Sequence, residues 1–67
     1  MTKKQLIALF EAMETTSHNC ARSAEETGST RLYHFERGHA SALATVISVL
    51  KNPKFAKELA EIYEVAL

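Results

Sequence analysis

A carboxylate and an imidazole lie three residues apart near the middle of the chain, as Glu36 and His39. If this segment is helical, side chains three apart share one face, so the two can hold one ligand together. Oxygen and nitrogen donors of this kind suit zinc or iron. In an antiparallel helical hairpin His18 lies at a similar height. We therefore take Glu36, His39 and His18 as the candidate metal ligands.

The Glu-x-x-His spacing is the one by which ferritin-like carboxylate bundles hold two metal ions. Such bundles also need a facing Glu on another helix, whereas residues 20–22, level with Glu36, are cysteine, alanine and arginine. A two-fold axis near this level would instead duplicate Glu36 and His39 in one cluster. The alternative is that His39 is a core histidine hydrogen-bonded across an interface. We favour this alternative and expect no bound cofactor.

The chain carries none of the motifs that mark common enzyme classes. It has no Gly-rich phosphate loop, no nucleophile elbow, no His-Glu-x-x-His helix and no Cys-x-x-Cys pair. The single Cys20 excludes an internal disulfide and is interpreted as a small core residue. We expect no catalytic residues and no enzyme activity. An unpaired cysteine and the lack of a recognisable secretory signal favour the cytoplasm.

Charge excludes further function classes. Eight basic residues balance eight acidic ones, so no net field attracts nucleic acid or an anionic membrane. The apolar run at residues 40–50 is too short to span a bilayer, which needs about 20 apolar residues. We expect no membrane partner and no nucleic acid partner, and weak nucleic-acid binding is kept only as a second alternative function.

Start and stop signals divide the chain into three expected helices. Thr2 and Gln5 form a capping-box pattern, which starts the first helix. Gly28 suits the left-handed conformation that ends helices, and Asn52-Pro53 offers an N-cap followed by proline at the first helical position. The expected helices are residues 2–27, 29–51 and 53–66, in one domain.

The very short link at Gly28 makes the first two helices antiparallel neighbours. Residues whose numbers add to about 57 then lie at the same height. Small residues near the turn let the helices approach closely, and bulky ones at the open end, such as Leu6 and Phe10, predict a thick apolar core there. We expect the third helix to fold over this core or to reach across to a second chain.

The second helix is apolar over more of its girth than a chain of 67 residues can cover. One apolar stripe runs through Leu32, Phe35, His39, Ala42, Val46 and Val49, and its neighbour through Ala40, Leu43, Ile47 and Leu50. Self-association is therefore expected. The residues assigned to the core or the subunit interface are Leu6, Phe10, Met13, Leu32, Phe35, Ala42, Leu43, Val46, Ile47, Val49, Leu50, Phe55, Leu59 and Ile62.

These features predict an all-α fold: a long antiparallel helical hairpin with a short C-terminal helix, assembling as a dimeric helical bundle. Excess apolar surface on a short chain favours a small non-enzymatic interaction, regulatory or adaptor module of a bacterial or phage type. It would act as a homo-oligomer and bind another protein through its helical faces. The alternative is a zinc- or iron-binding bundle with Glu36 and His39 at the subunit interface.

Overall fold

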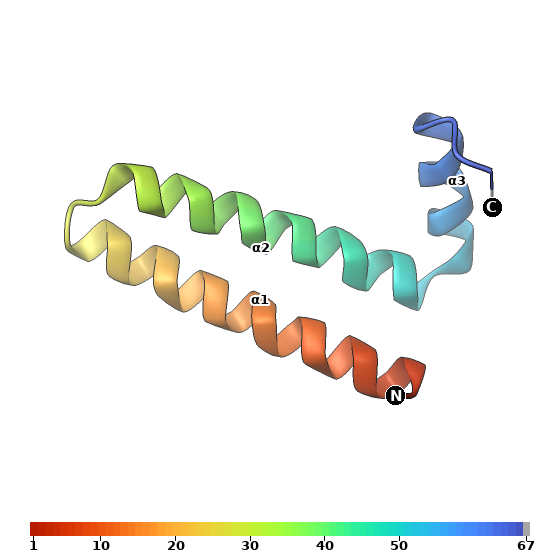
Figure 1. The fold of residues 1–67 in the computed structure, drawn as a ribbon, viewed down its shortest axis with the longest axis horizontal. Coiled ribbons are helices and arrows are strands. Elements are labelled where there is room, and N and C mark those ends of the chain that lie inside the picture. Colours follow the sequence, from red (N-terminus) through yellow and green to blue (C-terminus); the bar gives the residue numbers. More distant parts are fainter. Residues whose placement is uncertain (67) are drawn as a thin grey trace.

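The computed structural model describes residues 1–66 and is all-helical (Figure 1). Helix α1 (Lys3–Glu26) and helix α2 (Thr30–Lys51) pack against each other as an antiparallel hairpin. Helix α3 (Pro53–Ile62) contacts the end of α2 and, in the described part of the chain, does not touch α1. The expected all-α class and the hairpin are confirmed. None of the helices in residues 1–66 combines the length and the apolar character that crossing a membrane requires.

The starts of α1 and α3 are fixed by side-chain caps. The Gln5 amide N–H donates to the Thr2 hydroxyl at 3.1 Å, and the Thr2 N–H donates to the Gln5 side chain at 2.8 Å, which completes the capping box. At the start of α3 the Asn52 side chain accepts from the N–H groups of Lys54 and Phe55. These bonds satisfy amide groups that a helix start otherwise leaves without partners.

Helices α1 and α3 are each followed by a residue in the left-handed backbone conformation. Gly28 has φ 78°, and the N–H of the next residue donates to the Ala24 carbonyl at 2.8 Å. Helix α3 ends in the same way, with Glu64 at φ 56° and a 2.8 Å bond from the following N–H to the Ala60 carbonyl. Helix α3 therefore stops at Ile62, short of the expected end at residue 66. A glutamate in this conformation gives no sequence signal, which explains the difference.

The hairpin is joined along one seam of residues spaced alternately three and four apart, as in coiled coils. Every seam residue is buried or half-buried. The seam residues are Ile7, Phe10, Glu14, Ser17, Ala21 and Ala24 on α1, and Tyr33, Glu36, Ala40, Leu43, Ile47 and Leu50 on α2. Ser17 lies beside His39, at hydrogen-bonding distance, as expected for residues whose numbers add to about 57.

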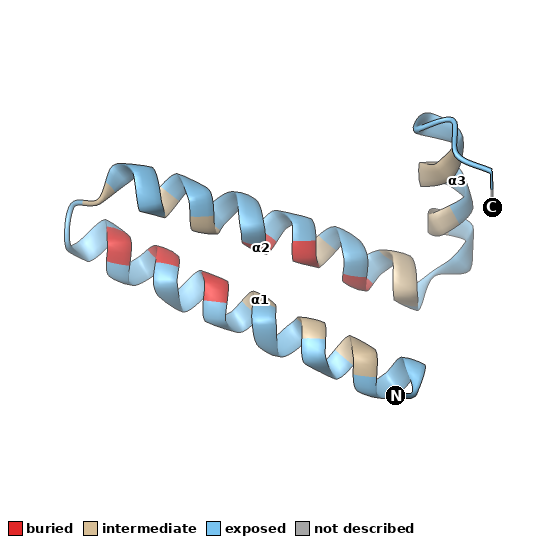
Figure 2. Cartoon of the chain, viewed as in Figure 1, coloured by how far each residue is buried: buried red, intermediate tan, exposed pale blue. Residues whose placement is uncertain are grey.

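The most buried part of the seam lies near the turn and in the middle of the hairpin (Figure 2). The buried residues are Ser17, Ala21, Ala24, Ala40, Leu43 and Ile47. Leu6 and Phe10 are only half-buried, so the expected thick core at the open end is wrong. Small side chains let the helices approach most closely near the turn (Figure 1), and α3 does not cover the open end of α1.

The structure distinguishes the two apolar stripes of α2. The stripe with Ala40, Leu43 and Ile47 faces α1, whereas much of the stripe with Phe35 and Val46 lies exposed. Of the residues assigned to the core or interface, those exposed in the single chain are Met13, Leu32, Phe35, Ala42, Val46 and Ile62. The half-buried ones are Leu6, Phe10, Val49, Leu50, Phe55 and Leu59. Both stripes are apolar, so periodicity alone cannot select the inner one.

The molecule is one helix thick. Its principal extents are 42 × 27 × 14 Å, and an α-helix with side chains is about 10–12 Å across. The radius of gyration is 14.3 Å, against about 11 Å for a compact domain of this length. The two helices therefore cover the seam from its sides, and the part of the chain that the structure describes adds no second layer above or below it.

Close approach at the alanine seam predicts a position-specific effect of added bulk. Ala40 is 2% exposed, and we expect Ala40→Leu to force the helices apart and lower the free energy of unfolding by about 1–3 kcal/mol. Ala8→Leu makes the same change on the exposed side of α1 and should shift it by less than about 0.5 kcal/mol. Urea unfolding followed by circular dichroism, at one protein concentration, measures both. Equal effects of the two variants on the free energy of unfolding would contradict close packing of the helices at Ala40.

Candidate functional site

A hollow of about 420 Å³ on one face of the hairpin brings together Cys20, Glu36 and His39. We call it the hairpin hollow. It is lined by Ala12, Met13, Thr16, Ser17 and Cys20 from α1, and by Phe35, Glu36 and His39 from α2. The structure thus brings the two expected α2 ligands together with Cys20. That cysteine is exposed, so its assignment as a core residue is wrong.

A hydrogen bond between Ser17 and His39 joins the two helices at this hollow. The Ser17 Oγ lies 2.8 Å from the His39 Nδ1, with donor and acceptor set by the histidine tautomer. Ser17 is 3% exposed, whereas the His39 side chain is 46% exposed. His39 is thus hydrogen-bonded across the contact between the two helices, as expected for a core histidine. Its side chain is nevertheless largely exposed to solvent. Ser17 lies level with the His39 segment, as the expected hairpin places it, and its contact with His39 depends in addition on how far each helix is rotated about its axis.

Glu36 lies deeper than His39. Its side chain is only 15% exposed because it occupies a seam position facing α1. The Glu36 Oε2 lies 3.9 Å from the same His39 Nδ1, an ion pair when the imidazole is protonated. Both contacts of His39 therefore use Nδ1, and Nε2 is the ring nitrogen left for another ligand. The Phe35 ring stacks on the imidazole at a centroid distance of 6.2 Å, which fixes the ring plane further.

Serine, histidine and glutamate are also the residue types of a hydrolytic triad, but the geometry differs. In a triad the serine bonds one imidazole nitrogen and the carboxylate orients the other. Here Ser17 and Glu36 both approach Nδ1 of His39. The nucleophile would also be a hydroxyl on a residue that is 3% exposed. The contact is suited to tying α1 to α2 rather than to activating the serine.

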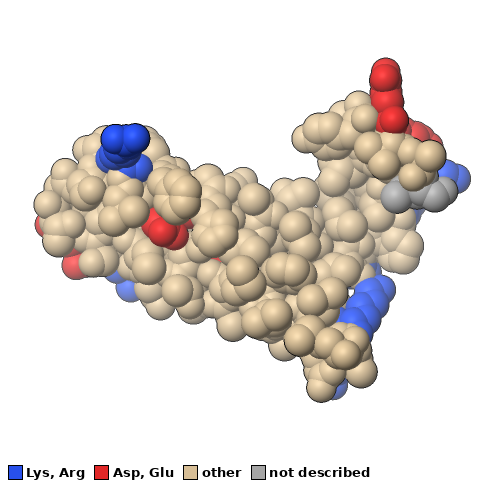
Figure 3. Space-filling model, in the orientation of Figure 1, with Lys and Arg blue, Asp and Glu red and all other residues tan. Residues whose placement is uncertain are grey.

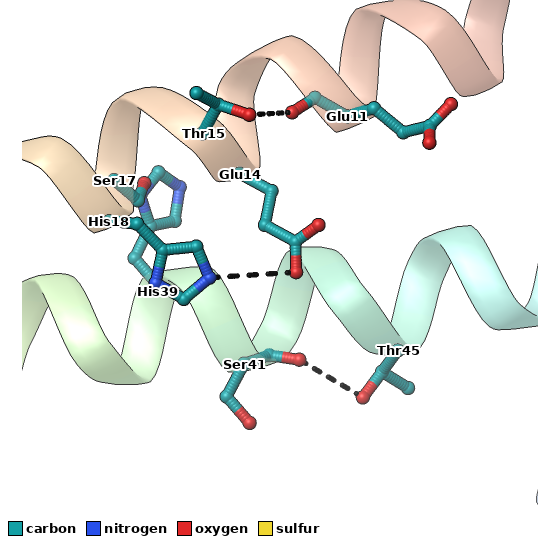
Figure 4. Close-up of polar contacts among 8 residues, drawn as sticks. All are labelled: Glu11, Glu14, Thr15, Ser17, His18, His39, Ser41 and Thr45. Atoms are coloured by element: carbon teal, nitrogen blue, oxygen red, sulfur yellow. Dashed lines mark hydrogen bonds and ion pairs between the residues drawn. The ribbon is translucent and has the colours of Figure 1, made fainter.

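The third expected ligand lies elsewhere. The His18 Nε2 is 3.8 Å from the Glu14 Oε2 one helical turn away, and His18 lines a different hollow with Arg22 and Arg37. Figure 4 shows Glu14 reaching His18, with Ser17 and His39 grouped beside them. Among residues 1–66, no group of three or more His, Cys, Asp or Glu side chains is placed to hold a metal ion. A complete site would need donors from a second chain.

The two faces of the hairpin differ in polarity. The hollow side carries large exposed apolar residues, and we call this side the apolar face. Its exposed residues at helical spacing are Leu9, Met13 and Cys20 on α1, and Leu32, Phe35, His39 and Val46 on α2. The hollow that His18 lines is charged, because Arg22, Glu25 and Arg37 also line it. Figure 3 shows a broad, largely uncharged surface with charged side chains mainly towards its ends and edges.

In comparisons with known proteins, no family model, curated protein sequence or solved structure matches the chain. Function is therefore inferred from the apolar face, the hairpin hollow and their polar contacts.

The Ser17–His39 contact predicts a measurable energetic coupling. A double-mutant cycle of Ser17→Ala and His39→Ala should give an interaction free energy of about 0.5–1.5 kcal/mol, typical of one hydrogen bond. The control cycle pairs Ser17→Ala with His34→Ala, since His34 is exposed and stacks edge-on against Tyr33. Thermal or urea unfolding of the variants provides the values. Additive effects in the Ser17–His39 cycle would show that the contact does not hold the hairpin.

Proposed function

We propose that this protein is a small non-enzymatic helical interaction module that acts as a homo-oligomer, most simply a dimer. The observation that carries the proposal is the apolar face of a hairpin only one helix thick. Exposed apolar surface of this extent favours a protein interface. A second hairpin laid on the first would supply the missing layer and give a four-helix core.

The accessible surface area supports this assembly quantitatively. The chain exposes 5213 Å², whereas a compact monomer of 7.5 kDa is expected to expose about 4,200 Å². The excess is roughly 1,000 Å² per chain. A standard protein interface buries about 800 Å² on each partner, so covering the excess requires an interface of ordinary size.

The remaining surface would be free for another protein. Helix α3 projects from the end of α2, and Ile62 at its end and Tyr63 and Val65 after it are exposed. Tyr63 and Val65 also line an apolar hollow with Val49 of α2. An adaptor or regulatory role in the cytoplasm would use this end of the molecule. Nucleic-acid binding is the weaker alternative because Arg22 and Arg37 share their hollow with Glu25, which reduces the local positive field.

Substitutions at two neighbouring α2 residues distinguish the loss of association from the loss of folding. Sedimentation equilibrium at micromolar concentration should give the wild type a mass near twice the 7.5 kDa of the chain. Val46→Glu, on the apolar face, should produce a helical monomer, since Val46 is 38% exposed. Ile47→Glu should unfold the chain, because it places an unpaired charge in the seam, where Ile47 is 7% exposed. A wild type that is monomeric at these concentrations and unfolds cooperatively would refute the proposal.

A second candidate function is metal binding at the subunit interface. The favouring observation is that His39 holds Ser17 through Nδ1, because metal-binding histidines commonly bond protein groups through one nitrogen and the metal through the other. A two-fold axis through the apolar face would bring together two copies each of Glu36 and His39. Such a set of oxygen and nitrogen donors suits zinc or iron, most simply as a structural ion.

Elemental analysis of protein purified without a histidine tag tests this second function. A bound metal predicts stoichiometric zinc or iron that is lost in His39→Ala and kept in His34→Ala, a matched change at an exposed histidine outside the hollow. Added zinc should also raise the melting temperature of the wild type, since a ligand bound only by the folded state stabilises it. Metal-free wild type whose melting is unchanged by zinc would leave His39 with a structural role only.

A further inference from the structure

We propose that the apolar face binds a second copy of this chain through a reciprocal contact, in which the Phe35 ring of each protomer enters the hairpin hollow of the other. This inference rests on the proposed homo-oligomer and adds the surface and the central contact. It requires a projecting apolar side chain and a matching hollow on one face, and both are present.

Phe35 is the projecting group. It is 66% exposed, although it lies in the middle of an otherwise well-formed hairpin. Its ring stacks on the His39 imidazole with an angle of 25° between the planes, and His39 is itself bonded to Ser17. The ring is therefore supported from one side in a defined orientation. An aromatic side chain contributes about 150–250 Å² when buried, which makes Phe35 the strongest candidate anchor on this face.

The hairpin hollow is the matching recess. Its volume is about 420 Å³, and its α1 wall is formed by Ala12, Met13, Thr16 and Cys20. The wall is mostly apolar. Methionine adapts its shape to a neighbour, and its sulfur makes favourable contacts with aromatic rings. Phe35 lies on the rim of the same hollow. A two-fold axis beside the rim would therefore place each Phe35 ring in the hollow of the other protomer. An isologous interface has this reciprocal form.

Three properties favour a second copy over a different protein. The exposed α2 stripe repeats at spacings of three and four, and Leu9, Met13 and Cys20 on α1 lie four and seven residues apart, which also places them on one helix face. This is the pattern of helices that pack on helices. The chain has a net charge of zero, so two copies do not repel. The surface excess of roughly 1,000 Å² per chain matches one dimer interface rather than a small peptide contact.

The other apolar surface is at α3 and serves as an internal control. A second hollow, of about 260 Å³, is lined there by Val49, Ala56, Leu59, Ala60, Tyr63 and Val65. Tyr63 is 72% exposed, similar to Phe35, so truncating either ring removes comparable exposed aromatic surface. Only Phe35 belongs to the face on which both long helices carry apolar stripes.

Sedimentation equilibrium of Phe35→Ala and Tyr63→Ala tests the contact. We expect Phe35→Ala to raise the dimer dissociation constant by about tenfold or more, as truncation of an interface anchor does. Tyr63→Ala should change it by less than about twofold. Thr16→Trp, which fills the hollow from an exposed position and leaves Phe35 intact, should weaken the dimer as Phe35→Ala does. Circular dichroism confirms that each variant keeps its helices.

The only cysteine of the chain gives an independent readout, because Cys20 lines the hollow and is exposed in the single chain. Its reaction with an aromatic disulfide reagent should be slower in the wild-type dimer than on dilution to monomer, and fast at both concentrations in Phe35→Ala. A wild-type dimer that survives Phe35→Ala and Thr16→Trp, with Cys20 equally reactive in dimer and monomer, overturns this inference and leaves the homo-oligomer standing. A monomeric wild type overturns both.

Discussion

A single layer of two packed helices can enclose only a narrow seam of side chains, and the exposure of the other apolar residues follows from this limit. The hairpin is 14 Å thick, so its seam is covered by the side chains of its own two helices and, within residues 1–66, by no second layer of helices. Among residues 1–66, Leu43 and Ile47 are the only larger apolar side chains that are buried, and the other buried residues are a serine and alanines. Apolar residues beside the seam, such as Phe35 and Val46, remain exposed for the same reason.

The composition of the seam decides where the hollow forms and which polar groups reach it. Small residues near the turn bring α1 and α2 close enough for the Ser17 hydroxyl to reach His39 at 2.8 Å. Glu36 occupies a seam position and lies largely covered beside the imidazole. The apolar face therefore has a polar group at its centre, held by hydrogen bonding and ring stacking, with apolar stripes on both sides. Such an arrangement combines a fixed orientation with surface that association can bury.

Local signals predicted the helices because caps and turns depend on a few adjacent residues. The capping box at Thr2, the left-handed Gly28 and the Asn52-Pro53 start all lie where the sequence indicated. The inner face of α2 was not predictable in this way, because two neighbouring stripes are both apolar and packing partners choose between them. The end of α3 depends on Glu64 in a left-handed conformation, which is uncommon for a residue other than glycine.

The candidate site was predicted in part. The pairing of Glu36 with His39 follows from helical spacing, since residues three apart share a face. The role of Ser17 and the separate position of His18 depend on how far each helix is rotated about its axis, and a height estimate along the hairpin does not contain that rotation. The exposure of Cys20 has the same origin: its stripe lies beside the seam and not in it.

If a second chain completes the core of this hairpin, the melting temperature of the protein should depend on its concentration. When folding is coupled to dimer formation, mass action stabilises the folded state as the concentration rises. With an unfolding enthalpy of about 0.7 kcal/mol per residue, a hundredfold increase in concentration should raise the melting temperature by roughly 10 °C. A cooperative transition with the same midpoint over that range would show that association does not stabilise the folded hairpin and would contradict a core completed by a second chain.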